Sequence, residues 1–418
     1  MQLFTQPGIS KALLSHEDFI RDIETFREFD KETAVLEFPD PSFDIQVYVN
    51  EFWTSKQRAA NSLHEVSYRA CFKPQLPGFF ISRLTSPGDA VYDPFLGRGT
   101  TVIEAALLGR RPVGNDINPL SKILVKPRFC PPTVADVSER IDTLSLSQEC
   151  KVWDDLLTFY HPETLRQITN LRSYILGRAA CGELDSVDEW IRMVATNRLT
   201  GHSPGFFSVY TLPPNQAVTV ERQRSINEKR EQVPPERDVK QSILKKSRSL
   251  LSKIEPSDLQ TLRAVSKEAL LVTGSSDNTP DIPGDSIDLV VTSPPFLDVV
   301  DYKSDNWLRC WFNGIDAQDV AIWQLKKPAE WQAAMTRTLV ELKRVLKPGG
   351  HVAFEVGEVR NGKILLESLI VPAVAEAGLR PLMVLVNDQV FTKTSNCWGV
   401  DNLKKGTNTN RIILIQKS

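Results

Sequence analysis

"DAVYDPFLGRGTTVIEAALLGRRPVGNDINP", residues 89–119, is the stretch that decides the fold of this 418-residue chain. It reads as an apolar strand, a glycine turn, an amphipathic helix and a second strand, which together make a βαβ unit. Strands and helices alternate again after residue 265, which predicts an α/β fold with a mainly parallel sheet. In that second part we expect strands at 269–273, 287–292, 351–356, 382–386 and 411–416, and helices at 302–312, 331–345 and 364–377.

The middle of the chain breaks this alternation. Several helical segments surround an irregular stretch, "TGHSPGFFSVYTLPPNQAV" at 200–218, and we find no internal repeat. A different middle between two α/β pieces predicts a domain inserted into a parallel-sheet domain. The predicted organisation is an N-terminal arm at 1–59, a first catalytic part at 60–130, an insertion at 131–265 and a second catalytic part at 266–418.

Composition limits the class of protein. The formal net charge is −2, so any surface for nucleic acid must be a local patch. The six cysteines are scattered without a C-x-x-C pair, which favours reduced thiols in a cytosolic protein and argues against a zinc site. The start of the chain lacks the features of a signal peptide, and no apolar run approaches the roughly eighteen residues of a membrane helix.

The glycine turn after the first strand has the composition of a cofactor cradle. Gly97 and Gly99 allow a tight turn, and Thr100 can cap the helix, whose N-terminal amides suit polar or anionic ligand groups. Asp116, at the end of the next strand, suits the hydroxyls of a ribose. A plain strand–turn–helix explains the glycines about as well. Asp93 favours the cofactor interpretation, because a carboxylate would repel a pyrophosphate but accept the ammonium of S-adenosylmethionine.

"TSPPF", residues 292–296, ends the apolar strand that begins at 287. One interpretation is a strand terminator with a core aromatic, because two prolines cannot continue a ladder of backbone hydrogen bonds. The other is a grip on a planar base that bears an amino group. Ser293 and the backbone carbonyls of Ser293 and Pro294 offer acceptors, and Phe296 offers a ring for stacking. Both motifs would lie at the carboxyl ends of neighbouring strands, where open α/β sheets bind ligands.

Together these motifs resemble those of the amino-group DNA methyltransferases, which methylate cytosine N4 or adenine N6. "DPFLGRGTT", "GNDINP" and "TSPPF" are similar to motifs I, II and IV, and "FKPQLPGFFI" at 72–81 to motif X. "HVAFEVG" and "TNRIILIQK" fit the later strands, so the resemblance covers about 60–135 and 268–418. It implies the class I S-adenosylmethionine-dependent methyltransferase fold, which is Rossmann-like. That fold has a mostly parallel seven-stranded sheet with an antiparallel last strand, here with an inserted, largely helical target-recognition region.

The resemblance also implies roles for particular residues. Cofactor contacts are expected from Phe72, Lys73, Pro74, Asp93, Pro94, Phe95, Gly97, Gly99, Thr100 and Asp116, and at the adenine from Ser275 and Asp277. The residues expected to hold the target base, and so to be catalytic, are Ser293, Pro294, Pro295 and Phe296. No metal is expected.

The leading serine of the motif favours cytosine N4 in double-stranded DNA, within a restriction–modification system whose endonuclease acts separately. The order X, I, insertion, IV resembles the arrangement of many adenine-N6 enzymes, so adenine N6 is the alternative. An RNA or protein amide methyltransferase and a non-catalytic nucleotide-binding module are further alternatives. The family implies a protein of the bacterial or archaeal cytoplasm that is associated with the nucleoid through DNA.

The insertion contains a basic segment. Residues 221–253 hold ten Lys or Arg and five Asp or Glu, a net charge of +5 (10 − 5). Such a run alone reads as a solvated helix face. Inside an insertion that interrupts the catalytic sheet, it predicts a DNA contact. The candidate DNA-binding residues are Lys245, Lys246, Asn215 and Gln216.

Overall fold

The predicted βαβ unit forms β3 (Ala90–Asp93), α3 (Thr100–Leu107) and β4 (Arg111–Asp116), and its two strands are parallel. The computed structural model describes residues 15–54, 60–69, 71–211, 217–295, 297, 302–359, 364–388 and 410–418. Phe296, Asn215 and Gln216 lie outside these described residues.

Seven strands form the arrangement expected of the class I methyltransferase fold. Their order is β10-β11-β7-β6-β3-β4-β5, with β11 antiparallel to both neighbours and the other pairs parallel. From the central strand β3 the chain runs outward to β4 and β5 and then returns to β6 on the other side. The crevice between β3 and β6 is therefore the topological switch point, where such sheets bind ligands. The bounds of the remaining strands are β5 (Leu270–Thr273), β6 (Ile287–Thr292), β7 (Leu346–Val356), β10 (Arg380–Asn387) and β11 (Asn410–Gln416).

The sheet has nine strands and not the seven expected, because the N-terminal segment adds two. After α1 (His16–Glu24), β1 (Ala34–Glu37) pairs antiparallel with β2 (Gln46–Asn50), and β2 lies parallel to β10. Asn387 on β10 strengthens the junction, since its Oδ1 accepts the backbone N–H of Phe52 at 2.7 Å. The segment predicted to be an arm is therefore part of the catalytic sheet.

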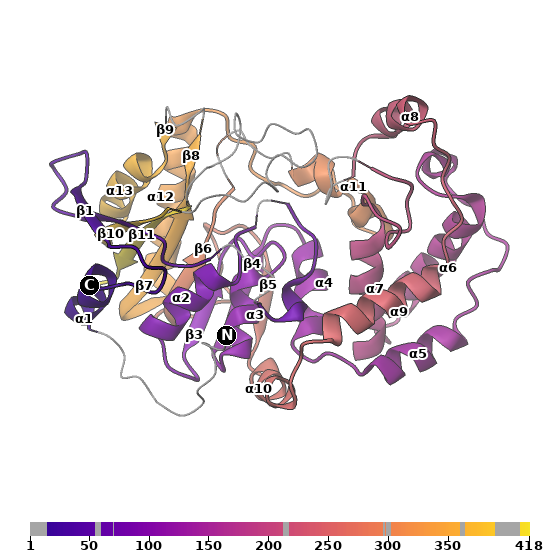
Figure 1. The fold of residues 1–418 in the computed structure, drawn as a ribbon, viewed down its shortest axis with the longest axis horizontal. Helices are drawn as coiled ribbons and strands as arrows, with labels where there is room; N and C mark the ends of the chain where they lie inside the picture. The colour runs from indigo at the N-terminus through magenta and orange to yellow at the C-terminus, as the bar shows by residue number, and fades with distance from the viewer. Residues whose placement is uncertain are drawn as a thin grey trace.

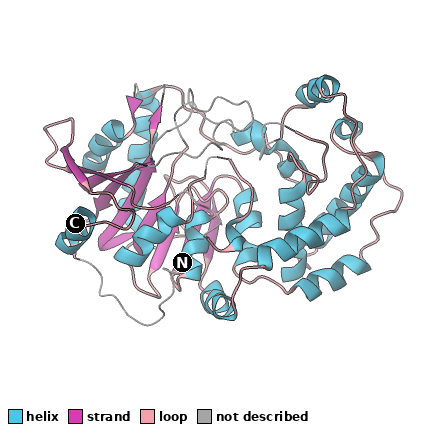
Figure 2. Cartoon of the chain, in the orientation of Figure 1, coloured by secondary structure: helices cyan, strands magenta, loops and turns pink. Residues whose placement is uncertain are grey.

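Helices cover both faces of the sheet (Figures 1 and 2). Alternate residues of a strand point to opposite faces, so each strand feeds two apolar clusters. Tyr92 and Val290 pack with α12 (Pro328–Val345) and α13 (Glu367–Glu376) on one face. Val91 and Leu289 pack with α2 (Gln75–Leu84) on the other.

The later predicted helices and strands are confirmed, with shifted ends. The predicted helix at 302–312 forms α11 (Tyr302–Phe312). The α12 helix starts at 328, because a proline at the first helical position fits its geometry. The segment "LKPGG", residues 346–350, reads as a turn in the sequence but lies inside β7, with an irregularity in the pairing of β7 with β6 and a φ of 78° at Gly349. The other short elements are η2 (Ser62–His64), η3 (Lys126–Arg128), η4 (Asp154–Thr158), β8 (Glu358–Val359) and β9 (Ile364–Leu365).

The helical middle lies within the β4–β5 connection and forms the right-hand lobe of Figure 1. Its apolar side chains do not form a core of their own. Trp190 and Phe207 belong to the same buried cluster as Val102 on α3 and Leu124 on α4, so the lobe is packed onto the catalytic sheet domain. The helices of this connection are α4 (Leu120–Val125), α5 (Val134–Thr143), α6 (Pro162–Ala180), α7 (Ser186–Arg198), α8 (Val220–Lys229), α9 (Val239–Leu251) and α10 (Pro256–Ser266).

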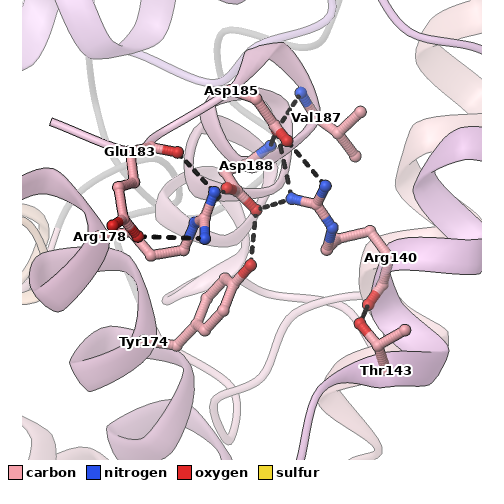
Figure 3. A network of polar contacts seen from close by, with 8 residues as sticks. All are labelled: Arg140, Thr143, Tyr174, Arg178, Glu183, Asp185, Val187 and Asp188. Carbon is pink, nitrogen blue, oxygen red and sulfur yellow. Dashed lines mark hydrogen bonds and ion pairs between the residues drawn. The ribbon is translucent and has the colours of Figure 1, made fainter. Parts of the chain in front are cut away.

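A buried carboxylate ties three helices of this lobe together (Figure 3). Asp188 on α7 is fully buried and accepts hydrogen bonds from Arg140 of α5 and from Arg178 and Tyr174 of α6. The Arg178 Nε–Asp188 Oδ2 distance is 2.7 Å, and Arg140 also pairs with Asp185 at 2.7 Å. A buried charge that is fully paired fixes the relative positions of the helices that carry its partners. Within the described ranges, no helix is both long enough and apolar enough to cross a membrane.

Candidate functional site

A pocket opens at the carboxyl ends of β3, β4, β5 and β6, at the switch point of the sheet. Its space not filled by atoms, open mouth included, is about 860 Å³. Many predicted cofactor residues and two predicted target residues lie in its wall, so the fold brings the two motifs to one cavity. The lining consists of Tyr68, Arg69, Cys71, Phe72, Asp93, Pro94, Phe95, Leu96, Gly97, Thr100, Asp116, Ile117, Asn118, Ser275, Ser276, Ser293, Pro295, Ala321, Ile322 and Trp323.

The glycines of the turn are required by geometry. Gly97 and Gly99 have φ of 51° and 78°, in the left-handed region that favours glycine. A Cβ on Gly99 would lie 2.4 Å from Cγ2 of Val125, so no side chain fits there. The Gly97 N–H donates to Asp116 Oδ2 at 2.7 Å. The turn is thus folded back onto the end of β4, and it leaves its backbone facing the pocket.

Asp93 lies at the end of β3, almost completely buried but in the pocket wall. Its Oδ1 accepts the Thr292 hydroxyl at 2.6 Å and the Phe95 N–H at 3.1 Å. Burial raises the pKa of this carboxyl to about 7, against the lowering effect of those donors. A cationic ligand group beside Asp93 would favour its ionised form, as the prediction of an ammonium contact requires.

Asp116, at the end of β4, is partly exposed to the pocket. Its Oδ2 accepts from Gly97 and its Oδ1 accepts the N–H of Asn118 at 2.9 Å. Burial raises the pKa of this carboxyl too. A carboxylate oxygen has two lone pairs, so each oxygen keeps acceptor capacity for a pair of hydroxyl donors.

Two residues of the target motif, Ser293 and Pro295, line the pocket. Each neighbours a residue that is not part of the lining. The carboxyl of Glu355 on β7 is buried, and burial raises its pKa to about 7, while the neighbouring Ser293 hydroxyl acts to lower it. Asn410 Nδ2 donates to the same carboxyl at 2.8 Å. The indole Nε1 of Trp331 donates to the Pro295 carbonyl at 2.8 Å. Glu355 and Trp331 were not predicted from sequence, because a lone glutamate in a strand and a tryptophan on a helix resemble core residues.

Arg98 joins the segment before α2 to the glycine turn. This buried guanidinium donates to the carbonyls of Val66 at 3.0 Å and Phe72 at 3.3 Å and to Thr100 Oγ1 at 3.1 Å. Phe72 is thereby held in the pocket wall. Arg98 occupies the variable position between the two glycines, so the spacing of the motif gave no reason to select it.

Of the two residues predicted to lie at the adenine, only Ser275 is among the residues that line the pocket. Asp277 pairs with Arg337 at 3.1 Å and accepts the Ser275 hydroxyl at 2.5 Å. Trp323 was not predicted from the sequence. It packs edge-on against Phe95, with ring centroids 6.3 Å apart. The other described residues of the prediction that are not among the lining residues are Lys73, Pro74, Gly99 and Pro294.

The two described DNA candidates differ in exposure. Lys245 on α9 is exposed. The Lys246 side chain is only 12% exposed, lies 3.7 Å from Glu65, and has a pKa that burial lowers to about 8. Lys246 is therefore poorly placed for a phosphate, and Lys245 remains the candidate.

The pocket suits S-adenosylmethionine. Asp93 matches an ammonium group, Asp116 matches ribose hydroxyls, and the N-terminus of α3 beside the glycine turn suits a carboxylate. Among the described residues, no group of three or more His, Cys, Asp or Glu is arranged to hold a metal ion.

Comparison with known proteins identifies relatives. Residues 20–124 match the model of a family described as DNA methylase. Type II methyltransferase M.BsoBI of Geobacillus stearothermophilus is 21% identical over 373 residues, which are 82% of this chain and 68% of that protein. Type II methyltransferase M.MjaII of Methanocaldococcus jannaschii is 32% identical over 73 residues, 17% of this chain and 14% of its own length.

Among solved structures, the rRNA methyltransferase aviRa of Streptomyces viridochromogenes is 12% identical, with a TM-score of 0.35, and the match covers 87% of this chain and 94% of that one. The fold assignment depends instead on the strand order described above. The strand order, the motif order and the family match agree, and together they support the amino-group DNA methyltransferases, a family of S-adenosylmethionine-dependent enzymes.

Proposed function

We propose that the protein is a site-specific DNA methyltransferase that transfers a methyl group to the exocyclic N4 amino group of cytosine in double-stranded DNA. The observation that carries the proposal is that Ser293 shares one pocket wall with Asp93 and Asp116. The target motif therefore opens onto the space that suits the methyl donor. When bound, S-adenosylmethionine supplies an electrophilic methyl group on a sulfonium centre.

The residues of the target motif would activate the amino nitrogen by hydrogen bonding. The lone pair of an amino group conjugated to its ring is delocalised, which makes the nitrogen a weak nucleophile. Acceptors at its two protons, the Ser293 Oγ and the Pro294 carbonyl, would favour a pyramidal nitrogen with a localised lone pair. Positioning is then the main catalytic contribution, and no covalent cysteine intermediate is needed.

Glu355 gives Ser293 a defined role in proton transfer. An ionised Glu355 would accept the proton of the neighbouring Ser293 hydroxyl, and the serine oxygen would then present lone pairs toward the amino group. The amino nitrogen must lose a proton on methylation, and Ser293 Oγ followed by the Glu355 carboxylate offers a path for it. A carboxyl with a pKa near 7 is suited to accept a proton at neutral pH.

The DNA must deliver its base into a recessed pocket. A duplex hides the amino group in its stack, so the base would be flipped out, with Phe296 predicted to stack on it. The helical lobe next to the pocket is the proposed target-recognition region, and Lys245 on its α9 is a candidate phosphate contact.

Adenine N6 is the second candidate target. The insertion lies between β4 and β5, after the first motif and before the target motif, the order that resembles many adenine enzymes. The named relatives are type II methyltransferases, which supports a role as the modification enzyme of a restriction–modification system.

The test is to incubate the protein with radiolabelled S-adenosylmethionine and mixed-sequence DNA and to digest the product to nucleosides. Label in N4-methylcytosine supports the proposal, and label in N6-methyladenine selects the alternative. RNA and protein substrates are run in parallel, and label only there, or binding without transfer, contradicts it. Ser293→Ala should lower turnover strongly and leave cofactor affinity nearly unchanged. A collapse of cofactor affinity would show that Ser293 serves the cofactor and not the base.

A further inference from the structure

A hydrogen bond joins the cofactor motif directly to the target motif. Thr292, the last residue of β6, is fully buried, and its hydroxyl donates to Asp93 Oδ1 at 2.6 Å. Asp93 is the last residue of the neighbouring strand β3. The residue after Thr292 is Ser293, which lines the same pocket.

The Thr292–Ser293 peptide also lies between two buried carboxyl groups. Thr292 bonds Asp93 on β3, whereas Ser293 neighbours Glu355 on β7 closely enough for its hydroxyl to influence the pKa of that carboxyl. Thr292 and Ser293 are consecutive, so this one peptide lies beside a buried carboxyl group of each neighbouring strand. Thr292 is β-branched, and a stiff side chain transmits the position of its anchor to the backbone.

We propose that Thr292 is a positioning residue that couples the two halves of the site: its hydroxyl holds Asp93, the carboxyl that faces the ammonium group of the cofactor, and anchors the peptide that carries Ser293. This inference rests on the proposed function, since it takes Asp93 as the cofactor's anion and Ser293 as the contact to the base.

The groups around Asp93 explain why loss of the Thr292 hydroxyl should raise the pKa of Asp93. Burial and, to a smaller extent, the nearby Asp116 raise the pKa of Asp93, which is about 7 with its hydrogen bonds in place, and Cys71 and Tyr92 are the other titratable neighbours. The hydrogen-bond donors that favour the ionised form are the hydroxyl of Thr292 and the N–H of Phe95, whereas the nearby Thr101 hydroxyl donates to the Val291 carbonyl. Removing the Thr292 hydroxyl takes away the first of these donors and leaves the burial in place.

The test is the pH dependence of cofactor affinity in Thr292→Val, which keeps the shape of the side chain. A hydrogen bond to a charged group contributes about 1.5–3 kcal/mol, so a rise of about one unit in the pKa of Asp93 is a cautious expectation. The dissociation constant of S-adenosylmethionine is measured by calorimetry from pH 6 to pH 9 for variant and wild type. We take the ratio of the variant's dissociation constant to that of the wild type, because the titration of the amine of S-adenosylmethionine affects both constants equally and cancels. With the pKa of Asp93 at about 7 in the wild type and about one unit higher in Thr292→Val, this ratio should be about one at pH 9, about five at pH 7 and about nine at pH 6.

Turnover supplies the second readout. At pH 9 and saturating cofactor, Thr292→Val should still methylate DNA several-fold more slowly, because Ser293 has lost its anchored neighbour. Thr292→Ser, which restores the hydroxyl, should recover both the affinity profile and the rate. Thr164→Val is the control for losing a buried threonine hydroxyl, since Thr164 bonds the backbone of Arg237 in the helical lobe and its ratio should stay at one at every pH.

The outcomes separate this inference from the proposed function. If the wild type binds no S-adenosylmethionine, the proposed function fails. If the wild type binds and methylates but the ratio for Thr292→Val is independent of pH, Thr292 only packs, and the coupling is wrong. Failure of Thr292→Ser to restore either readout also overturns it. Should Thr292→Val not fold, Thr292→Ala removes the hydroxyl without introducing a methyl group beside Asp93, and the same ratios apply.

Discussion

The indole nitrogen of Trp331 donates a hydrogen bond to the carbonyl oxygen of Pro295 at 2.8 Å. Trp331 is on α12 and almost completely buried, and Pro295 lies in the wall of the pocket. A core helix thus fixes the backbone of the target motif from outside the pocket. Together with the Thr292–Asp93 bond, this contact anchors the chain on both sides of the Ser293–Pro294 pair.

Trp331→Phe should lower turnover several-fold, because the Pro295 carbonyl loses its donor while an aromatic ring still fills the space. The hydrogen bond is worth about 1 kcal/mol, and cofactor affinity should change little. Trp190→Phe is the matched control, since the buried Trp190 indole donates to Ser247 Oγ at 3.0 Å inside the helical lobe. Thermal melts should show a similar loss of stability in Trp331→Phe and Trp190→Phe. Steady-state kinetics should show a loss of turnover only in Trp331→Phe. Equal rates in the two variants would refute the positioning role.

Gly99→Ala should destabilise the protein and abolish cofactor binding. A φ of 78° costs a residue with a side chain about 1–2 kcal/mol, and the new Cβ would also meet Val125 Cγ2 at 2.4 Å. Gly88→Ala separates the two effects, because Gly88 has a φ of 91° and a Cβ there would meet nothing within 4 Å. Urea unfolding should show the strain alone for Gly88→Ala and a larger loss for Gly99→Ala. Similar losses would mean that the turn accommodates the side chain.

The stability of the cofactor-free protein should fall as pH rises through neutrality. Burial raises the folded-state pKa of Glu355 from an ordinary 4.5 to about 7, so its contribution is fully present below pH 4.5 and lost as pH rises through 7. Between pH 5.5 and pH 8 this one group should cost about 2 kcal/mol of unfolding free energy. Glu355→Gln removes the titration, so the difference between wild type and variant in urea unfolding isolates it. A difference that is constant with pH would show that Glu355 does not titrate in this range.

Asp188→Asn should loosen the helical lobe, because Arg140 and Arg178 would lose the carboxylate between them (Figure 3). Breaking a buried ion pair costs about 3–5 kcal/mol. Asp185→Asn, at a more exposed position that pairs with Arg140 alone, should cost less. Hydrogen exchange should rise in α5, α6 and α7 of Asp188→Asn and not in the sheet. Uniform exchange changes would instead indicate that the whole molecule unfolds as one unit.

Lys245→Glu should weaken DNA binding and flatten its salt dependence by about one to two units of slope, as expected for a lost phosphate contact. Lys343→Glu is the control, since Lys343 is exposed near the end of α12, at the edge of the sheet away from the pocket. Binding is measured by fluorescence anisotropy over a range of salt concentrations. If both variants keep the wild-type slope, α9 does not touch the DNA backbone.

Local chemistry explains which parts of the site could be predicted. Gly97, Gly99 and Asp93 were found because a tight turn and an anion at a strand end need those residue types in adjacent positions. Arg98, Glu355 and Trp331 were missed because their partners are carbonyls and a hydroxyl that are distant in the sequence. Lys246 was selected from charge alone, and packing beside Glu65 removes it from the surface.

The sequence by itself determined the α/β alternation, the two motifs and their family, because periodicity, glycine geometry and strand-ending prolines act over a few neighbouring residues. Tertiary structure alone decided that the N-terminal segment completes a nine-stranded sheet, that the helical lobe shares a core with α3, and that Thr292 bonds Asp93. These contacts join residues as much as 335 positions apart, as Phe52 and Asn387 are. Contacts of that kind depend on how the strands are ordered in the sheet, and no local pattern in the chain encodes that order.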